Sequence, residues 1–270
     1  HSFGQNARGA VEQARISVAA LVGARPAEVT FSSGGTESNN HAIFGAVAAA
    51  AGDSKHVITC AVEHSAVLDP CEVLAMRGVA VTILPVDRDG VVNPEDVRRA
   101  IRPETVLITI MLANNELGTI EPIAEIGKIA AEAGVTLHTD AVQAAGKVPI
   151  DVNELGVHLL SISAHKFYGP KGVGALYVRK GTRIEPLLYG GHSERDQRPG
   201  TENVAAIAGM GAAAGLAMKR MEQESHRVSA LRDRLENGLL ARIPYVTVNG
   251  LPARRTPNTT NLTIPFVEGE

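Results

Sequence analysis

Short apolar runs alternate along this chain with stretches in which apolar residues recur at every third or fourth position. A short uninterrupted apolar run is typical of a strand buried on both faces, and the longer spacing is typical of a helix with one buried face. The runs predict strands over residues 28–32, 56–61, 79–84, 105–112, 135–139, 157–163 and 173–178. The longer spacing predicts helices over residues 6–22, 94–101, 122–133 and 204–240, and two more that end at residues 51 and 76. Strands that alternate with helices form βαβ units, so we expect an α/β fold with a mostly parallel sheet flanked by helices.

The end of the chain follows a different pattern. The predicted helix over residues 204–240 is long enough to link one domain to another, and two short strands are expected after it, over residues 245–248 and 261–264. We therefore expect a large α/β domain over residues 1–222. Residues 223–270 are expected to hold the linking helix and the start of a small α+β C-terminal domain, left incomplete. We therefore expect the chain to be a piece of a longer protein.

Composition and charge exclude several classes of function. The net charge of −3 and the absence of a basic run give no reason to expect nucleic acid. The strongly apolar stretch over residues 42–52 is too short to span a bilayer, and no secretory signal is visible. The two cysteines, Cys60 and Cys71, form no Cys-x-x-Cys motif, which is typical of a reducing compartment. We therefore expect a cytoplasmic protein that does not bind membranes.

Polar side chains gather at the carboxyl ends of the predicted strands. The residues at these ends are His64, Asn115, Asp140, Gln143, Ser163, His165 and Lys166. Open α/β sheets bind their ligands at that edge, so we expect one site there. A strand, a glycine turn and a helix start also meet at Gly34, Gly35 and Thr36, which is an arrangement that can bind an anion. An ordinary capped helix start is the alternative, and the turn matches neither a P-loop nor a dinucleotide-binding motif.

Lys166 follows a buried strand and precedes a turn rich in glycine and proline. Such a lysine can form a Schiff base where its surroundings favour the neutral amine, although a solvated loop lysine is the simpler interpretation. Together with a strand-end aspartate and a helix-terminal phosphate site, it suits pyridoxal phosphate. Asp140 would keep the ring nitrogen protonated, Thr36 and Ser163 would bind the phosphate, His64 would stack on the ring, and Gln143 or Asn115 would reach the ring oxygen. The histidines lack metal-ligand spacing, so no metal is expected.

Seven segments of the chain carry a resemblance to a known family. They are SGGTESNN (33–40), VEH (62–64), NNELG (114–118), HTDAVQ (138–143), SISAHKFYGPKG (161–172) and GGH with RPGTEN (190–192 and 198–203). In this order and at this spacing they closely resemble the cysteine desulfurases of the NifS/IscS type, within the class V aminotransferases. The resemblance covers essentially the whole chain.

The resemblance implies a homodimeric fold-type-I enzyme that uses pyridoxal 5'-phosphate to convert L-cysteine to L-alanine. The sulfur would pass as a persulfide to an iron–sulfur scaffold or another acceptor. Lys166 would hold the cofactor, His64 would stack on its ring and assist proton transfer, and Asp140 would pair with the ring nitrogen. The remaining residues implied are Asn115 and Gln143 at the ring oxygen, Gly35, Thr36, Ser163 and His165 at the phosphate, Thr201 at the phosphate of the neighbouring subunit, and His192 in the substrate pocket.

The chain departs from the family at its end. The family's catalytic cysteine and its substrate-binding arginine are expected beyond a segment that matches residues 267–270 here. Cys60 lies in a predicted strand and Cys71 in a predicted helix, so both are expected to be small buried side chains. We therefore expect residues 1–270 to bind the cofactor without desulfurating cysteine. A related class V enzyme, such as a selenocysteine lyase or an aminotransferase, is an alternative, as is a non-catalytic dimer partner that keeps the fold.

Overall fold

The computed structural model describes residues 2–250 and 254–266. A seven-stranded sheet runs through the molecule in the order β1-β7-β6-β5-β4-β2-β3. Its strands are β1 (Val29–Ser32), β2 (His56–Cys60), β3 (Ala80–Leu84), β4 (Thr105–Thr109), β5 (Thr136–Asp140), β6 (Leu159–Ser163) and β7 (Gly174–Val178). The central pairs are parallel, whereas β7 pairs antiparallel with both β6 and β1. The predicted mostly parallel sheet flanked by helices is therefore confirmed.

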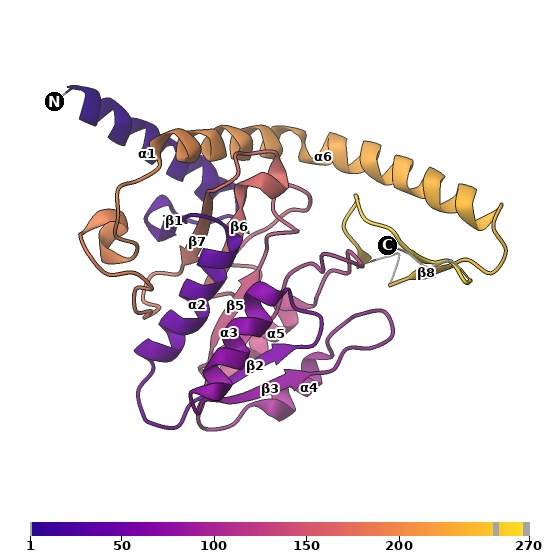
Figure 1. The fold of residues 1–270 in the computed structure, drawn as a ribbon, viewed down its shortest axis with the longest axis horizontal. Coiled ribbons are helices and arrows are strands. Elements are labelled where there is room, and N and C mark those ends of the chain that lie inside the picture. Colours follow the sequence, from indigo (N-terminus) through magenta and orange to yellow (C-terminus); the bar gives the residue numbers. More distant parts are fainter. Residues whose placement is uncertain (1, 251–253, 267–270) are drawn as a thin grey trace.

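Helices cover both faces of this sheet (Figure 1). They are α1 (Ser2–Leu21), α2 (Gly35–Ala49), α3 (Ser65–Met76), α4 (Pro94–Ala100), α5 (Ile123–Ala133) and α6 (Val204–Leu240), with short 3-10 turns η1 (Pro26–Glu28), η2 (Ala164–Phe167) and η3 (Ser193–Asp196). Each helix predicted from the apolar spacing is present, with ends within a few residues of the predicted ones.

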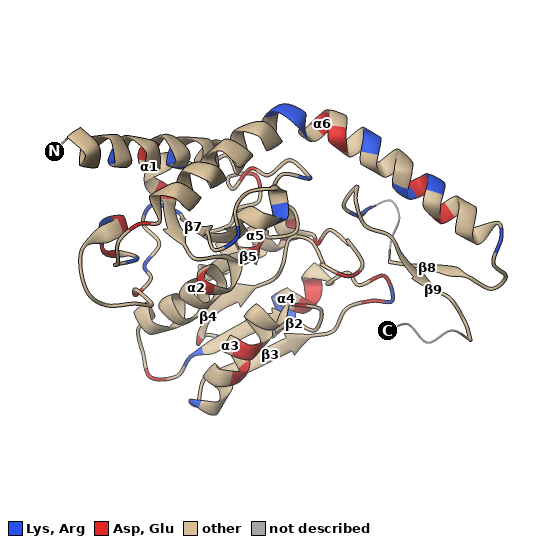
Figure 2. Ribbon diagram, turned by 45° about the horizontal axis from the view of Figure 1, so that its top comes forward, with Lys and Arg blue, Asp and Glu red and all other residues tan. Residues whose placement is uncertain are grey.

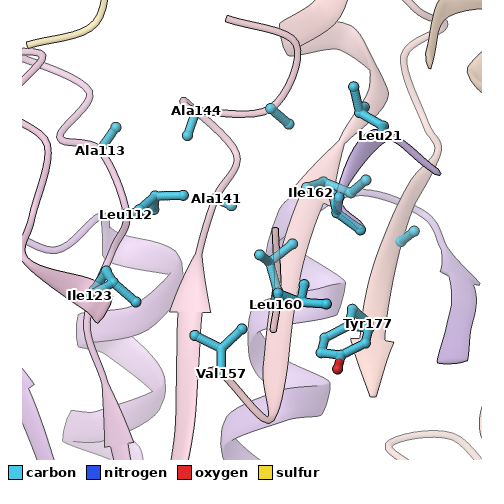
Figure 3. Close-up of a cluster of buried hydrophobic side chains, with 14 of the residues drawn as sticks. Leu21, Leu112, Ala113, Ile123, Ala141, Ala144, Val157, Leu160, Ile162 and Tyr177 are labelled. Carbon is cyan, nitrogen blue, oxygen red and sulfur yellow. The ribbon is translucent and has the colours of Figure 1, made fainter. Parts of the chain in front are cut away.

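The apolar runs of the strands divide between two cores. Leu160 packs in the cluster that also holds residues of α1, α5 and α6, and Leu159 packs in a second cluster with residues of α2 and α3. Successive residues of a strand point to opposite faces, so a strand covered on both sides must be apolar throughout. Figure 3 shows the first cluster, in which Leu160 of β6 lies beside Tyr177 of β7.

The predicted strand over residues 105–112 is too long, because β4 ends at Thr109. Ile110 and Leu112 still donate backbone hydrogen bonds to His138 and Asp140 of β5. The N–H of Met111 instead donates to the Glu63 side chain, at 2.6 Å from its Oε1 atom. The Glu63 side chain thus accepts the hydrogen bond that a neighbouring strand would otherwise accept. The chain then continues into the loop that carries Asn115.

The C-terminal segment lies under the far half of α6 (Figure 1). Two short strands, β8 (Thr247–Asn249) and β9 (Asn261–Thr263), pair antiparallel there, as the sequence predicted. α6 is continuous through residue 222, where we placed the domain boundary, so that division stays a prediction. Residues 251–253 and 267–270 lie outside the described residues. The second of these ranges is the segment that resembles the family's Val-Glu-Gly-Glu sequence. Within the described part, no helix has the length and apolar character needed to cross a membrane.

Candidate active site

A cavity of about 290 Å³ opens at the carboxyl edge of β5 and β6. Nine of the ten predicted site residues line it: Gly35, Thr36, His64, Asn115, Asp140, Gln143, Ser163, His165 and Lys166. They come from the start of α2, the loop before α3, the loop after β4, and the ends of β5 and β6. The parallel order of β4, β5 and β6 brings their carboxyl ends to one edge, which is why residues far apart in sequence share this cavity.

The turn that carries Lys166 is anchored on both sides by buried residues. β6 runs directly into η2, whose Ala164 and Phe167 are buried. Tyr168 then adopts a left-handed conformation (φ 66°), and Gly169 packs so closely that an added Cβ atom would lie 2.9 Å from the Cβ atom of Ala164. With Ala164 and Phe167 fixed in the core, Lys166 is left half-buried in the cavity wall. This position in the cavity wall favours a role at the site over a solvated loop lysine.

Asp140 is a buried carboxylate with two donors. Its Oδ1 atom accepts from the N–H of Val142 at 2.8 Å, and its Oδ2 atom accepts from Asn39 Nδ2 at 2.6 Å. Burial raises the pKa of Asp140, while these two hydrogen bonds and the charges of His64 and Lys166 act in the opposite direction. Asn39 also lines the cavity and is buried, although no role was predicted for it from the sequence. Its signal was a position four residues after Gly35, on the same face of the helix.

The start of α2 forms a close-fitting cradle. A Cβ atom on Gly35 would lie 2.7 Å from Val142 Cγ2, and one on Gly174 would lie 2.7 Å from the Gly34 backbone. The first N–H groups of a helix lack partners within the helix and favour an anion. On the strand side, Ser163 Oγ and His165 Nδ1 are hydrogen-bonded at 2.9 Å. Hydroxyl, imidazole and helix-terminal N–H groups thus converge where a phosphate was predicted.

His64 has its tautomer set by the backbone. It is the N-cap of α3, and its Nδ1 atom accepts from the N–H of Ala66 at 3.0 Å. A neutral imidazole that accepts at Nδ1 carries its proton on Nε2. This exposed ring lines the cavity with a defined donor nitrogen. Two other residues that line the cavity have side-chain partners. Gln143 Oε1 accepts from Lys147 Nζ at 2.9 Å, and Asn115 Nδ2 donates to Glu116 Oε1 at 2.8 Å.

A second buried carboxyl group, Glu63, lies next to the site and was also missed. Its Oε1 atom accepts from the N–H of Met111 at 2.6 Å and from Cys60 Sγ at 3.1 Å. Burial raises the pKa of Glu63 to about 8, so the group is largely protonated at neutral pH. Sequence alone gave no signal for this, because a glutamate beside a histidine is usually exposed.

Both cysteines are buried, as predicted. Burial raises the pKa of the Cys60 thiol far above its ordinary value and that of Cys71 to about 12. Because the thiolate is the nucleophile, neither is suited to attack a substrate. Among the residues that the structure describes, no group of three or more His, Cys, Asp or Glu side chains could hold a metal ion.

Thr201 is the tenth residue predicted to bind the cofactor, and it lies outside this cavity. It lines a separate cavity of about 190 Å³ with Ser33 and Arg198. Arg198 Nε lies 2.8 Å from Glu37 Oε1 in the first turn of α2, so the Thr201 loop is tied to the cradle helix. Its expected role toward a neighbouring subunit stays a prediction.

His192 is exposed, hydrogen-bonded to Asp196 at 2.7 Å, and is not among the residues that line the active-site cavity.

Comparison with known proteins identifies the family of this chain. The family described as aminotransferase class-V matches residues 1–270. The cysteine desulfurase IscS of Dictyoglomus turgidum is 54% identical over 270 residues, which cover all of this chain and 68% of that protein. The chain belongs to the class V aminotransferases, in the NifS/IscS group of cysteine desulfurases.

Solved structures show the same relationship. A NifS-like protein superposes with a TM-score of 0.95 at 37% identity, over 99% of this chain and 73% of that one. SspA, solved in complex with cysteine, gives a TM-score of 0.87 at 38% identity, over 98% of this chain and 74% of its own. The predicted resemblance to the NifS/IscS cysteine desulfurases is thus confirmed, and these matches do not favour the selenocysteine lyase, aminotransferase or non-catalytic alternatives.

Proposed function

We propose that this protein is a cysteine desulfurase that binds pyridoxal 5'-phosphate in the cavity at the carboxyl edge of β5 and β6. The observation that carries the proposal is the convergence of Lys166, Asp140 and the α2 cradle in that one cavity. L-Cysteine is the proposed substrate and L-alanine the product. Membership of the NifS/IscS group supports this choice, as does the related SspA, which was solved with cysteine.

The side chains present fit the chemistry of this cofactor. Lys166 supplies the amine that can hold an aldehyde covalently, and Asp140 supplies a buried acceptor for a protonated ring nitrogen. Gly35, Thr36, Ser163 and His165 form the cradle for a phosphate group, and Gln143 and Asn115 lie where a ring oxygen can be bound. Any residue larger than glycine at position 35 would collide with Val142. The shape of the cradle therefore depends on glycine at this position.

When bound, pyridoxal phosphate supplies an acceptor for electrons from the substrate carbon. The protein's residues hold it and move protons. The Asp140 carboxylate, which accepts from Asn39 and from the N–H of Val142, would favour the protonated ring nitrogen. The amine of Lys166 would carry a proton to or from the substrate carbon. His64 lines the same cavity with its Nε2 proton available and is proposed to stack on the ring and assist that transfer.

Sulfur transfer requires a reactive thiol, and neither Cys60 nor Cys71 can serve because both are buried with raised pKa values. We propose that residues 1–270 alone bind the cofactor without releasing alanine from cysteine. The sulfur would pass as a persulfide to an iron–sulfur scaffold or another acceptor protein. We further propose that the enzyme is a cytoplasmic homodimer in which Thr201 reaches the partner's phosphate site.

The cofactor assignment is tested by reconstitution with pyridoxal phosphate. The protein is expected to gain a visible absorption band, and borohydride reduction should leave a permanent mass increase on the peptide that contains Lys166. Lys166→Ala should remove both signals. Lys171→Ala changes an exposed lysine of the same turn and should retain them. A mass increase on Lys171 in the native protein, or a protein that stays colourless, would contradict the assignment.

A further inference from the structure

Lys147 lies behind the active-site cavity and contacts one of the residues that line it. Its Nζ atom donates to Gln143 Oε1 at 2.9 Å. Between them the chain forms a helical turn, in which Ala145 and Val148 donate backbone hydrogen bonds to Ala141 and Ala144. Side chains four residues apart lie on one side of such a turn, so this contact is built into the local backbone.

The contact decides which way the Gln143 amide faces. An amide has an acceptor oxygen and a donor NH2 group, and it can present either to a ligand. A lysine ammonium has donors and no acceptor, so it can pair only with the oxygen. With Oε1 held by Lys147, the NH2 group is the end that remains for the cavity. Gln143 therefore presents a donor, which suits an anionic or acceptor oxygen and opposes a ligand donor.

Lys147 also brings a second positive charge close to Lys166. Burial and, to a smaller extent, the Lys166 charge lower the pKa of Lys147 to about 8. The two turns are packed directly together, because a Cβ atom on Gly146 would lie 2.7 Å from the Cβ atom of Phe167, next to Lys166. The position of Lys147 is thus coupled to the turn that holds the anchoring lysine.

We propose that Lys147 is a positioning residue that fixes Gln143 as a hydrogen-bond donor to the ring oxygen of the cofactor. It acts through Gln143 and through its charge, without touching the ligand. This inference rests on the proposed function, since it takes pyridoxal phosphate as the ligand of the cavity. It predicts that the oxygen facing Gln143 is held in its anionic form.

The test compares Lys147→Met with Lys128→Met, an exposed lysine of α5 that serves as the matched control. Lys147→Met is expected to weaken pyridoxal phosphate binding by about tenfold, the size of one hydrogen bond to a charged group. It should also raise the pH midpoint at which the visible band of the loaded protein changes, because loss of a nearby positive charge favours protonation. A variant that matches Lys128→Met in both measurements overturns the proposal.

A double-mutant cycle separates action through Gln143 from a general structural effect. In a Gln143→Leu background, Lys147→Met should change the dissociation constant for pyridoxal phosphate clearly less than in the native background, since the oxygen that it holds is gone and only its charge remains. Independent, additive losses in the double variant would overturn the proposal. Failure of the native protein to bind pyridoxal phosphate would overturn the proposed function as well, whereas normal binding with an unaffected Lys147→Met variant would overturn only the role of Lys147.

Discussion

The pair formed by Asn39 and Asp140 shows how much of this site depends on one side chain. The two residues lie 101 positions apart in sequence, and both are buried at the cavity. Without its donors, a carboxyl group at this depth would favour the protonated form, because burial penalises charge. A protonated Asp140 could not stabilise a positive ring nitrogen. The hydrogen bond from Asn39 therefore favours the charged form on which the proposed chemistry relies.

Replacing Asn39 by alanine tests this at the scale of one residue. We expect Asn39→Ala to weaken pyridoxal phosphate binding by roughly tenfold or more, since a hydrogen bond to a charged group contributes about 1.5–3 kcal/mol. The measurement is a cofactor titration followed by absorbance. Asn237→Ala, at an exposed position of α6, is the control and should leave the affinity unchanged. Equal affinities for the two variants would refute the role given to Asn39.

At the scale of one element, the start of α2 has a shape that only glycine permits. α2 begins directly after the glycine turn, with Gly35 against Val142 and Gly34 against the backbone of Gly174. Helix α2 also contributes more buried residues to the second core than any other element, Ile43 and Val47 among them. The same helix thus combines a buried body, which fixes its direction, with an N-terminus that faces the cavity.

Gly35→Ala should affect the ligand more than the fold. The added Cβ atom must displace Val142 or shift the helix start, so we expect pyridoxal phosphate and inorganic phosphate both to bind at least about fivefold more weakly, a change of ~1 kcal/mol. Thermal unfolding and phosphate competition measure the two effects. Gly238→Ala is the matched change in α6, where nothing lies within 4 Å of the added atom. There alanine should raise stability by about 0.5–1 kcal/mol without altering binding.

At the scale of the whole molecule, α6 joins two regions of different character. Most of its buried residues, including Met210 and Ala214, lie in the first third, where Gly211 lets α6 approach Ala14 of α1. Charged residues of both signs cover its far half, as Figure 2 shows. There Arg255 pairs with Glu236 at 2.7 Å, and the same segment bridges to Thr119, next to the loop that carries Asn115. The C-terminal segment is thereby connected to the active-site loop.

Glu236→Gln is expected to loosen this connection. It removes the nearer negative charge from the Arg255 guanidinium, which is 2% exposed, and leaves only the Asp233 carboxylate at 3.8 Å. Loss of one partner of a buried ion pair costs about 3 kcal/mol or more. Hydrogen exchange should therefore speed up over residues 254–266 and 114–120, with little change in the central strands. Glu222→Gln on the exposed part of the same helix is the control. Unchanged exchange in both variants would show that the pair does not hold the segment.

Much of the fold followed from local patterns, because strand and helix periods are properties of short segments. A strand was predicted over residues 157–163, ahead of Lys166. The structure has β6 at Leu159–Ser163, and all five of its residues are buried. The predicted end of β4 was wrong, since the Glu63 side chain that captures Met111 comes from another part of the chain. Nine site residues were found because parallel strands place their carboxyl ends at one edge.

By itself, the sequence determined the order and type of the elements, the position of Lys166 at a strand end, and the glycine turn before α2. Only the tertiary structure decided which polar groups face one another. The Asn39–Asp140 pair, the burial of Glu63 and the contact between the Lys147 and Lys166 turns depend on packing between elements. Periodicity reports which face of a segment is buried, whereas the partner of a buried polar atom is set by strand order and helix packing across the whole chain.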